Sequence, residues 1–156
     1  MARISKHEYY MSIAFIASYR SSCLHRNAGA VIVVNDRVVA TGYNGAPQHS
    51  SIDCEDVGNC AKETGMTCRA EGLHAESNAI ISAALNGIAI KHSVMYTVFS
   101  PCFSCCNMII NAGIDRVYYA QPYSTWPAAK EYLPRHGIQC IQYGSDFITD
   151  LQEFLS

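Results

Sequence analysis

The sequence predicts an α/β protein built as a three-layer α/β/α sandwich around a five-stranded mixed sheet. Two observations carry this prediction. A pair of β-branched runs that resembles a hairpin comes early in the chain, and from residue 73 onward segments with helical spacing alternate with short β-rich segments. Alternation of this kind implies right-handed crossovers between parallel strands, with helices layered on the sheet. The sheet should therefore contain both antiparallel and parallel pairs.

Composition favours one soluble domain over residues 1–156. The chain has 156 residues, 49% of them hydrophobic and 15% charged, which is enough apolar surface to offset the ordering entropy of a compact core. The formal net charge of -2 provides no general cationic field for a polynucleotide, so small substrates fit better. We find no export signal and no apolar run near the roughly twenty residues of a membrane span. We therefore expect a cytoplasmic protein without a membrane partner.

The first half of the chain predicts a helix, a hairpin and a long polar segment. Residues 4–20 carry apolar side chains at helical spacing, with Ser5 available as a cap. Residues 28–43 form the two β-branched runs, which meet at Asn35 and Asp36, residue types that tolerate turn conformations. The segment that follows contains a cysteine-bearing insertion at about residues 46–72. Because bare loops of this length are uncommon in compact domains, we expect something to fasten it.

The second half predicts four helices and three strands. A helix over residues 73–87 ends at Gly87. The expected strands cover residues 93–100, 114–120 and 138–144, and the expected further helices cover residues 102–113, 125–137 and 146–155.

Two short motifs stand at the beginnings of two of these helices. His74 is followed two residues later by Glu76, and Pro101 precedes Cys102 and Cys105. Cysteines three residues apart lie on one face of a helix, so they can bind one zinc ion while the facing helix supplies His74. Three protein ligands leave one coordination position for water, which is typical of a catalytic zinc site.

Glu76 is placed to move protons at this site. A helix turns about 100° per residue, so the carboxylate points away from the bond between His74 and zinc yet stays close to the metal's water. Either motif alone is common on solvated helix faces or in structural zinc sites. Together they form the H-x-E and P-C-x-x-C signature of zinc nucleobase deaminases. Cys106 should face the core, as should Cys140.

These motifs and the segments around them resemble the deoxycytidylate deaminases from about Tyr10 to Gly144. The similarity covers GAVIVVNDRVVATGYNGAP, LHAESNAI, MYTVFSPCFSCCNMIINAGIDRVYYAQPY and the late HGIQC, in the order that the family has, and GYNGAP is the discriminating piece. The resemblance implies a cytidine deaminase-like fold and conversion of dCMP and water to dUMP and ammonia, which supplies thymidylate synthesis. Water would add to C4 of the pyrimidine while Glu76 protonates N3 and later the leaving amine.

The resemblance also implies residue roles, effectors and an assembly. Asn44 would contact the sugar and base of the substrate, Ala75 would offer a backbone N–H to the pyrimidine, and Ser100 would offer a carbonyl to the departing amine. Arg26 and Tyr123 would hold the phosphate. The family is commonly a hexamer activated by dCTP, with an Mg²⁺ ion beside that effector, and inhibited by dTTP. The effector residues would be Tyr43, Asn44 and Gly45.

Four further cysteines suggest a second, structural zinc ion. Three of them lie in the long insertion and one follows the first helix, so four thiolates could close a site that fastens the insertion. The set is Cys23, Cys54, Cys60 and Cys68, with His25 and His49 as competing ligands because imidazole also binds zinc. Free thiols remain the alternative.

Other functions share parts of this pattern. A deaminase of free cytidine, dCTP or transfer-RNA adenosine would have the same metal motif and differ in its substrate pocket. A zinc-stabilised interaction module without catalysis is the alternative from another class. Glu76 argues against such a module, because a purely structural site needs no carboxylate there and closes its fourth coordination position.

Overall fold

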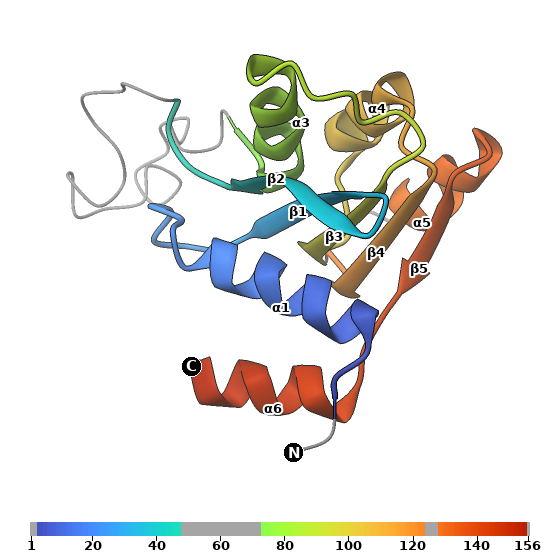
Figure 1. Cartoon of the computed structure of the whole chain (residues 1–156). Coiled ribbons are helices and arrows are strands. Elements are labelled where there is room, and N and C mark those ends of the chain that lie inside the picture. Colours follow the sequence, from blue (N-terminus) through green and yellow to red (C-terminus); the bar gives the residue numbers. More distant parts are fainter. Residues whose placement is uncertain (1–2, 48–72, 124–127, 156) are drawn as a thin grey trace.

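The computed structural model describes residues 3–47, 73–123 and 128–155 and contains one mixed sheet (Figure 1). Its five strands lie in the order β2-β1-β3-β4-β5. β1 (Gly29–Val34) pairs antiparallel with both β2 (Arg37–Tyr43) and β3 (Val94–Phe99). β4 (Arg116–Gln121) and β5 (Gln139–Gln142) extend the sheet in parallel with β3. The mixed five-stranded sheet predicted from the sequence is confirmed.

The hairpin turns at the residues that the sequence indicates. Asn35 and Asp36 both adopt positive φ angles, 49° and 61°. Two-residue hairpin turns with both central residues in this region match the right-handed twist of the flanking strands, and Asn and Asp tolerate that conformation. The turn therefore sets the register of β1 against β2 as far as Val33, beyond which the register shifts at an irregularity between Ile32 and Val33.

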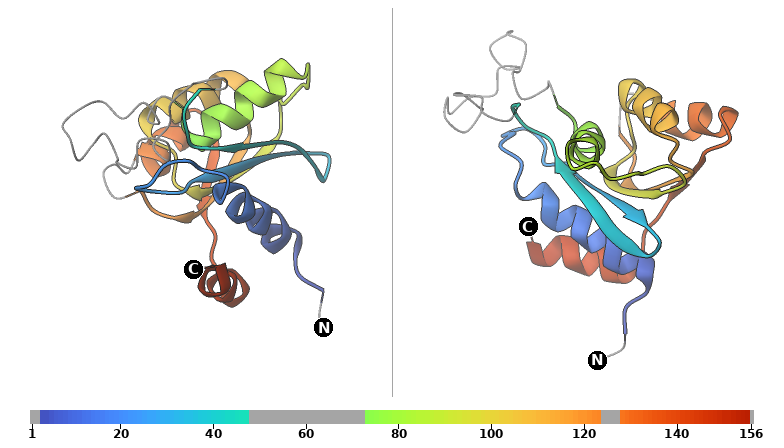
Figure 2. Two further views of the ribbon diagram at one scale, coloured as in Figure 1. Left: turned by 90° about the vertical axis from the view of Figure 1, so that its left-hand side faces the viewer. Right: turned by 45° about the horizontal axis from the view of Figure 1, so that its top comes forward.

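Helices cover both faces of the sheet (Figures 1 and 2). α1 (Lys6–Ser18) lies on one face, and α6 (Asp146–Leu155) packs beside it. α3 (Ala75–Leu85), α4 (Phe103–Ala112) and α5 (Ala128–Arg135) lie on the other face. This is the predicted three-layer sandwich.

The leading helix begins as predicted. The hydroxyl of Ser5 accepts a hydrogen bond from the backbone N–H of Glu8, and the Glu8 carboxylate accepts one from the backbone N–H of Ser5. This reciprocal capping box satisfies two backbone donors that a helix end leaves without partners.

Neighbouring residues of β1 point into two different cores. Val31 faces α1 and packs with Met11 and Tyr96, whereas Ile32 faces the layer of α3, α4 and α5 and packs with Met95 and Ile109; all six side chains are buried. Burial of one such apolar side chain contributes about 1.5–3 kcal/mol. Cys106 is fully buried in the second of these cores, which confirms that it faces inward.

Gly42 allows α3 to approach the sheet closely. A Cβ atom at this position would lie 2.2 Å from the backbone oxygen of Ala75 and 2.3 Å from the backbone nitrogen of Ala79. No side chain fits between two backbones at that separation. Gly42 therefore has a packing role, and it brings β2 against the first turn of α3, which carries Glu76.

We expect Gly42→Val to destabilise the protein by about 3 kcal/mol, because the new side chain must push α3 away from β2. Urea unfolding of the two proteins measures the difference. Gly144→Ala is the matched control, since a Cβ there would meet nothing within 4 Å, and it should change stability by less than about 0.5 kcal/mol. Equal stabilities of wild type and Gly42→Val would contradict the close-packing role.

Within the part of the chain that the structure describes, no helix combines the length and the apolar character needed to cross a membrane.

Candidate metal centre

The candidate site lies where α3 and α4 begin. His74 and Cys102 are the N-cap residues of these helices, with extended backbones at φ -79°, ψ 159° and φ -74°, ψ 172°. The helices thus start at Ala75 and Phe103, slightly later than predicted. Neither cap side chain bonds to its own helix, although N-cap positions favour short oxygen-bearing side chains that do so. His74 and Cys102 instead turn toward each other.

The three predicted ligands converge on one point. His74 Nδ1 lies 3.2 Å from Cys102 Sγ and 3.4 Å from Cys105 Sγ, and all three ligand atoms lie within 4.8 Å of one another. Zinc bonds of about 2.0–2.3 Å in a tetrahedron place ligand atoms roughly 3.5 Å apart. Among the described residues, no other group of three or more His, Cys, Asp or Glu side chains converges in this way. The donor set fits zinc.

The number of ligands indicates the kind of site. Structural zinc sites are closed by four protein ligands, whereas catalytic sites have three and admit water or substrate. The described residues offer one imidazole and two thiolates here. This set is typical of a catalytic zinc site.

Two electrostatic effects favour a thiolate at Cys102. Helix N-termini carry partial positive charge, and both α3 and α4 direct theirs toward the site. Hydrogen bonds from the side chain of Cys105 and from His74 also hold the pKa of Cys102 well below its usual value, whereas the contact with Cys102 and burial raise the pKa of Cys105. Thiolate is the form that binds a metal ion.

Glu76 is the buried carboxylate of the site. It is only 6% exposed, and its Oε2 lies 3.6 Å from Cys105 Sγ. Burial raises the pKa of Glu76 above its usual value because low dielectric disfavours the charged form. A carboxyl group whose pKa is moved toward neutrality both accepts and releases protons efficiently. The structure therefore brings Glu76 together with His74, Cys102 and Cys105, as predicted.

The residues predicted to hold a phosphate also lie together. The guanidinium carbon of Arg26 lies 4.8 Å from the ring centroid of Tyr123 and 5.0 Å from that of Phe99. Phe99 ends β3, three residues before Cys102. Contact with aromatic faces leaves the N–H edge of a guanidinium able to bind an anion.

Asn44 holds the segment that carries Arg26. Its side-chain amide donates to the Arg26 carbonyl at 2.8 Å, and its side-chain oxygen accepts from the Ala28 N–H at 2.7 Å. The backbone N–H of Asn44 also donates to the Ala28 carbonyl at 3.2 Å. Asn44 thus ties the end of β2 to residues 26–28, and its predicted contact with a substrate stays a prediction.

Ser100 and Ala75 border the metal ligands. The Ser100 hydroxyl accepts a hydrogen bond of 2.7 Å from the Tyr123 N–H, and the Ser100 N–H donates to the Gln121 carbonyl at 2.9 Å. Ala75 is the first residue of α3 and is fully buried. The first N–H groups of a helix have no partner inside it, so this position suits the backbone contact predicted for Ala75.

The predicted second zinc site lies largely outside the described residues. Cys54, Cys60, Cys68 and the competing His49 all fall in residues 48–72. Cys23 is half-buried, and its N–H donates to the Ser21 hydroxyl at 3.1 Å, while His25 is exposed. The second site therefore stays a prediction.

The predicted effector residues follow one another at the end of β2. Tyr43 is 37% exposed, and its carbonyl accepts from the Asn78 side chain. Gly45 is buried and pairs with Leu73, the residue before His74. The effector segment is thus joined directly to the start of α3.

Two residues with contacts at the site were missed by sequence reasoning. Ser77 places its hydroxyl oxygen 3.5 Å from Cys105 Sγ, and its spacing of three from His74, which puts both on one helix face, was an available signal. Phe99 contacts Arg26 across 73 positions of sequence, and no local pattern could have indicated that.

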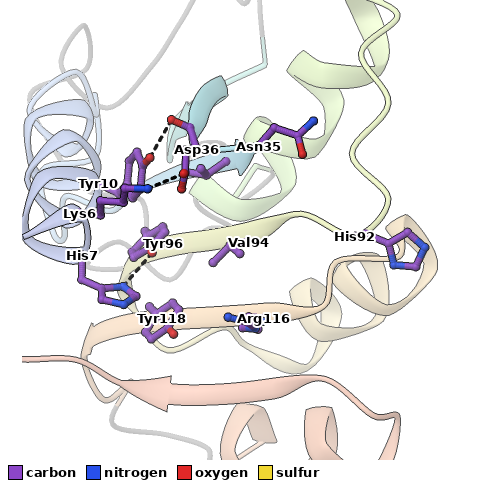
Figure 3. Close-up of a pocket in the computed structure, with 11 residues that line it drawn as sticks. Lys6, His7, Tyr10, Asn35, Asp36, His92, Val94, Tyr96, Arg116 and Tyr118 are labelled. Atoms are coloured by element: carbon purple, nitrogen blue, oxygen red, sulfur yellow. Dashed lines mark hydrogen bonds and ion pairs between the residues drawn. The ribbon is translucent and has the colours of Figure 1, made fainter.

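A groove of about 420 Å³ lies on the face of the sheet that α1 covers, beside the first turns of that helix (Figure 3). Lys6 pairs with Asp36 there, His7 hydrogen-bonds Tyr96, and Arg116 lines the groove on β4. It contains none of the metal-ligating residues. The groove is therefore separate from the candidate metal centre.

Comparisons with known proteins agree with this geometry. Residues 4–121 match the family described as the cytidine and deoxycytidylate deaminase zinc-binding region. ComE operon protein 2 of Bacillus subtilis is 37% identical over 97% of this chain and 79% of its own length. A deoxycytidylate deaminase of Schizosaccharomyces pombe is 34% identical over 90% of this chain and 45% of its own length. The chain thus spans about half of that yeast protein.

A solved structure extends the similarity to three dimensions. The dCMP deaminase from the cyanophage S-TIM5, in complex with dCMP and dUMP, superposes with a TM-score of 0.78 at 30% identity. The superposition covers 92% of this chain and all of the phage chain. The cytidine deaminase-like fold expected from the sequence is confirmed.

Proposed function

The chain belongs to the cytidine and deoxycytidylate deaminase family, and on that premise we propose that it converts dCMP and water to dUMP and ammonia. The observation that carries the proposal is the convergence of His74, Cys102 and Cys105 beside the buried carboxylate of Glu76. Hydrolysis of an amino-pyrimidine requires a zinc ion with an open coordination position and an adjacent general acid–base residue.

The residues of the site divide the work of the reaction. A bound zinc ion would supply a Lewis acid that makes water nucleophilic near neutral pH. Glu76 takes the two protons of the attacking water one after the other, delivering the first to N3 of the pyrimidine and the second to the leaving amine. His74, Cys102 and Cys105 hold the ion. The burial that raises the pKa of Glu76 suits a group that must gain and lose a proton in each turnover.

The position of Arg26 supports the proposal that the substrate carries a phosphate. Its guanidinium is held against Tyr123 and against Phe99, which immediately precedes Ser100, and Asn44 fixes the Arg26 backbone. A cation restrained in this way binds a monophosphate at low entropic cost. The S-TIM5 relative with bound dCMP and dUMP gives independent support for this substrate class.

Ammonia release tests the proposed function. Zinc-loaded protein should deaminate dCMP with a higher kcat/KM than deoxycytidine, cytidine, dCTP or single-stranded RNA. No dTTP should be present, and dCTP should be present only in the assay that tests it as a substrate. A higher kcat/KM for one of the other compounds would overturn the choice of dCMP, and release from none of them would favour the non-catalytic zinc module.

We expect Arg26→Gln to lower kcat/KM for dCMP by about 100-fold, since a charge-assisted phosphate contact contributes roughly 1.5–3 kcal/mol. Activity on unphosphorylated deoxycytidine should be nearly unchanged. The exposed Arg37→Gln is the control for loss of one positive charge. Equal losses on the phosphorylated and unphosphorylated substrates would refute the phosphate contact.

The remaining proposals concern regulation, assembly and the second ion. We propose activation by dCTP with Mg²⁺, inhibition by dTTP and a hexameric assembly. The link between Gly45 and Leu73 supports regulation, because it joins the effector segment to the start of α3. The structural zinc ion at Cys23, Cys54, Cys60 and Cys68 stays part of the proposal, with His25 and His49 as competing ligands.

A further inference from the structure

We propose that Ser77 is a positioning residue of the metal centre, whose hydroxyl donates a hydrogen bond to the Cys105 thiolate. The inference rests on the zinc site of the proposed function but does not depend on which nucleotide is the substrate. It gives the buried thiolate a hydrogen-bond partner outside the metal ion.

The geometry begins with the first turn of α3. Ser77 is the third residue of this helix, three positions after His74, so both side chains lie on the face that meets α4. The Ser77 oxygen lies 3.5 Å from Cys105 Sγ. Cys105 is only 1% exposed, so bulk water has little access to its sulfur. A donor for this sulfur has to come from the protein.

Ser77 differs from Ser12 and Thr149, which are hydroxyl residues in the described helices α1 and α6. Ser12 donates to the carbonyl of Glu8 at 2.7 Å, and Thr149 donates to that of Ser145 at 3.3 Å, in the usual back-bond of one helical turn. The carbonyl one turn before Ser77 belongs to Leu73, and it accepts the N–H of Gly45 at 3.2 Å. The Ser77 hydroxyl is directed to sulfur instead.

The two ligand sulfurs lie in different surroundings. Cys102 stands at the N-cap of α4, and its side chain makes no cap hydrogen bond to that helix. Cys105 lies one turn inside the helix, where the Ser77 hydroxyl is within hydrogen-bonding distance of its sulfur. On the proposal, Ser77 is the donor and Cys105 the acceptor of this bond.

Such a hydrogen bond affects a metal centre in two ways. It fixes the rotamer of the ligand before the ion arrives, which raises metal affinity. It also draws electron density from sulfur, so the thiolate gives less charge to the metal and the ion remains a stronger Lewis acid toward water. Loss of partners of this kind typically costs 10–100-fold in metal affinity or activity.

Metal binding by the full chain tests this role without any nucleotide. The probes are Co²⁺, whose sulfur-to-metal charge-transfer absorption reports the electron density on the thiolates, and Zn²⁺ in competition with a chromophoric chelator. We expect Ser77→Ala to move the charge-transfer band to lower energy and to raise the zinc Kd about tenfold. The variant should fold, because Ala is the best helix former.

Two further variants separate this role from a general effect on the helix. Ser77→Thr keeps a hydroxyl and should retain the wild-type band, while Ser82→Ala removes a serine from the same helix away from the site and should change neither readout. A wild-type band and wild-type zinc Kd in Ser77→Ala would overturn the proposal. Wild-type protein that gives the cobalt band but does not deaminate dCMP would support the metal centre and refute only the proposed substrate.

Discussion

Replacing Glu76 with Gln is expected to lower kcat for deamination by about 10³- to 10⁴-fold while zinc binding persists. Glutamine has nearly the same shape as glutamate but cannot take up and release a proton, so the general acid–base contribution is lost. Glu76 is not one of the three converging ligands, so the ion should stay bound. Stability should not fall, because a neutral amide costs less to bury than a carboxylate.

Ammonia release and metal analysis on the same Glu76→Gln sample measure the two effects together. Glu131→Gln is the matched control, because Glu131 is an exposed carboxylate on α5, and it should keep full activity. Near-wild-type turnover by the zinc-loaded Glu76→Gln protein would show that another group moves the protons. Loss of zinc from that variant would instead make Glu76 part of the metal coordination.

Cys102→Ala is expected to abolish both deamination and binding at the catalytic zinc site. One thiolate is then missing from a set of three, and the positive ends of two helices face a site that has lost a negative charge. Activity should fall below detection. Zinc content should fall by one ion per chain.

Metal content determined on dialysed protein tests this result. Cys106→Ala is the control. Cys106 directly follows the ligand Cys105 but is buried in the hydrophobic core, so this variant should keep the catalytic zinc ion. If Cys102→Ala kept the zinc content of the wild type, Cys102 would not be a metal ligand. If Cys106→Ala lost the ion, Cys106 rather than Cys105 would be the metal ligand.

Local signals predicted most of the fold. Asn35 and Asp36 marked the hairpin turn because their side chains tolerate positive φ, and Ser5 marked the start of the first helix as its cap. The alternation of strands and helices after residue 73 predicted the parallel half of the sheet. Each of these signals acts within a few residues of chain, which is why sequence alone could reveal it.

The starts of α3 and α4 show where local rules fail. His74 and Cys102 occupy N-cap positions, where Ser or Asp would stabilise a helix more. The protein is therefore less stable at the starts of α3 and α4 than it would be with a better N-cap residue, because these two positions hold metal ligands. Departures of this kind from local preference are expected at functional sites.

Local signals could not predict the contacts that hold Arg26. Arg26 lies against Phe99 and Tyr123, and Asn44 bonds to the backbone of residues 26 and 28. These contacts depend on how the end of β2, the segment after α1 and the ends of β3 and β4 come together in space. No periodicity or short motif encodes that arrangement.

The central claim is that His74, Cys102 and Cys105 hold one zinc ion beside Glu76. An anomalous-difference density map at the zinc absorption edge, from crystals of the zinc-loaded protein, tests it most directly. We expect a peak at bonding distance, about 2.0–2.3 Å, from His74 Nδ1, Cys102 Sγ and Cys105 Sγ, with no fourth protein ligand. The absence of a peak there, or a fourth side chain bound to the ion, would contradict the assignment of a catalytic zinc centre.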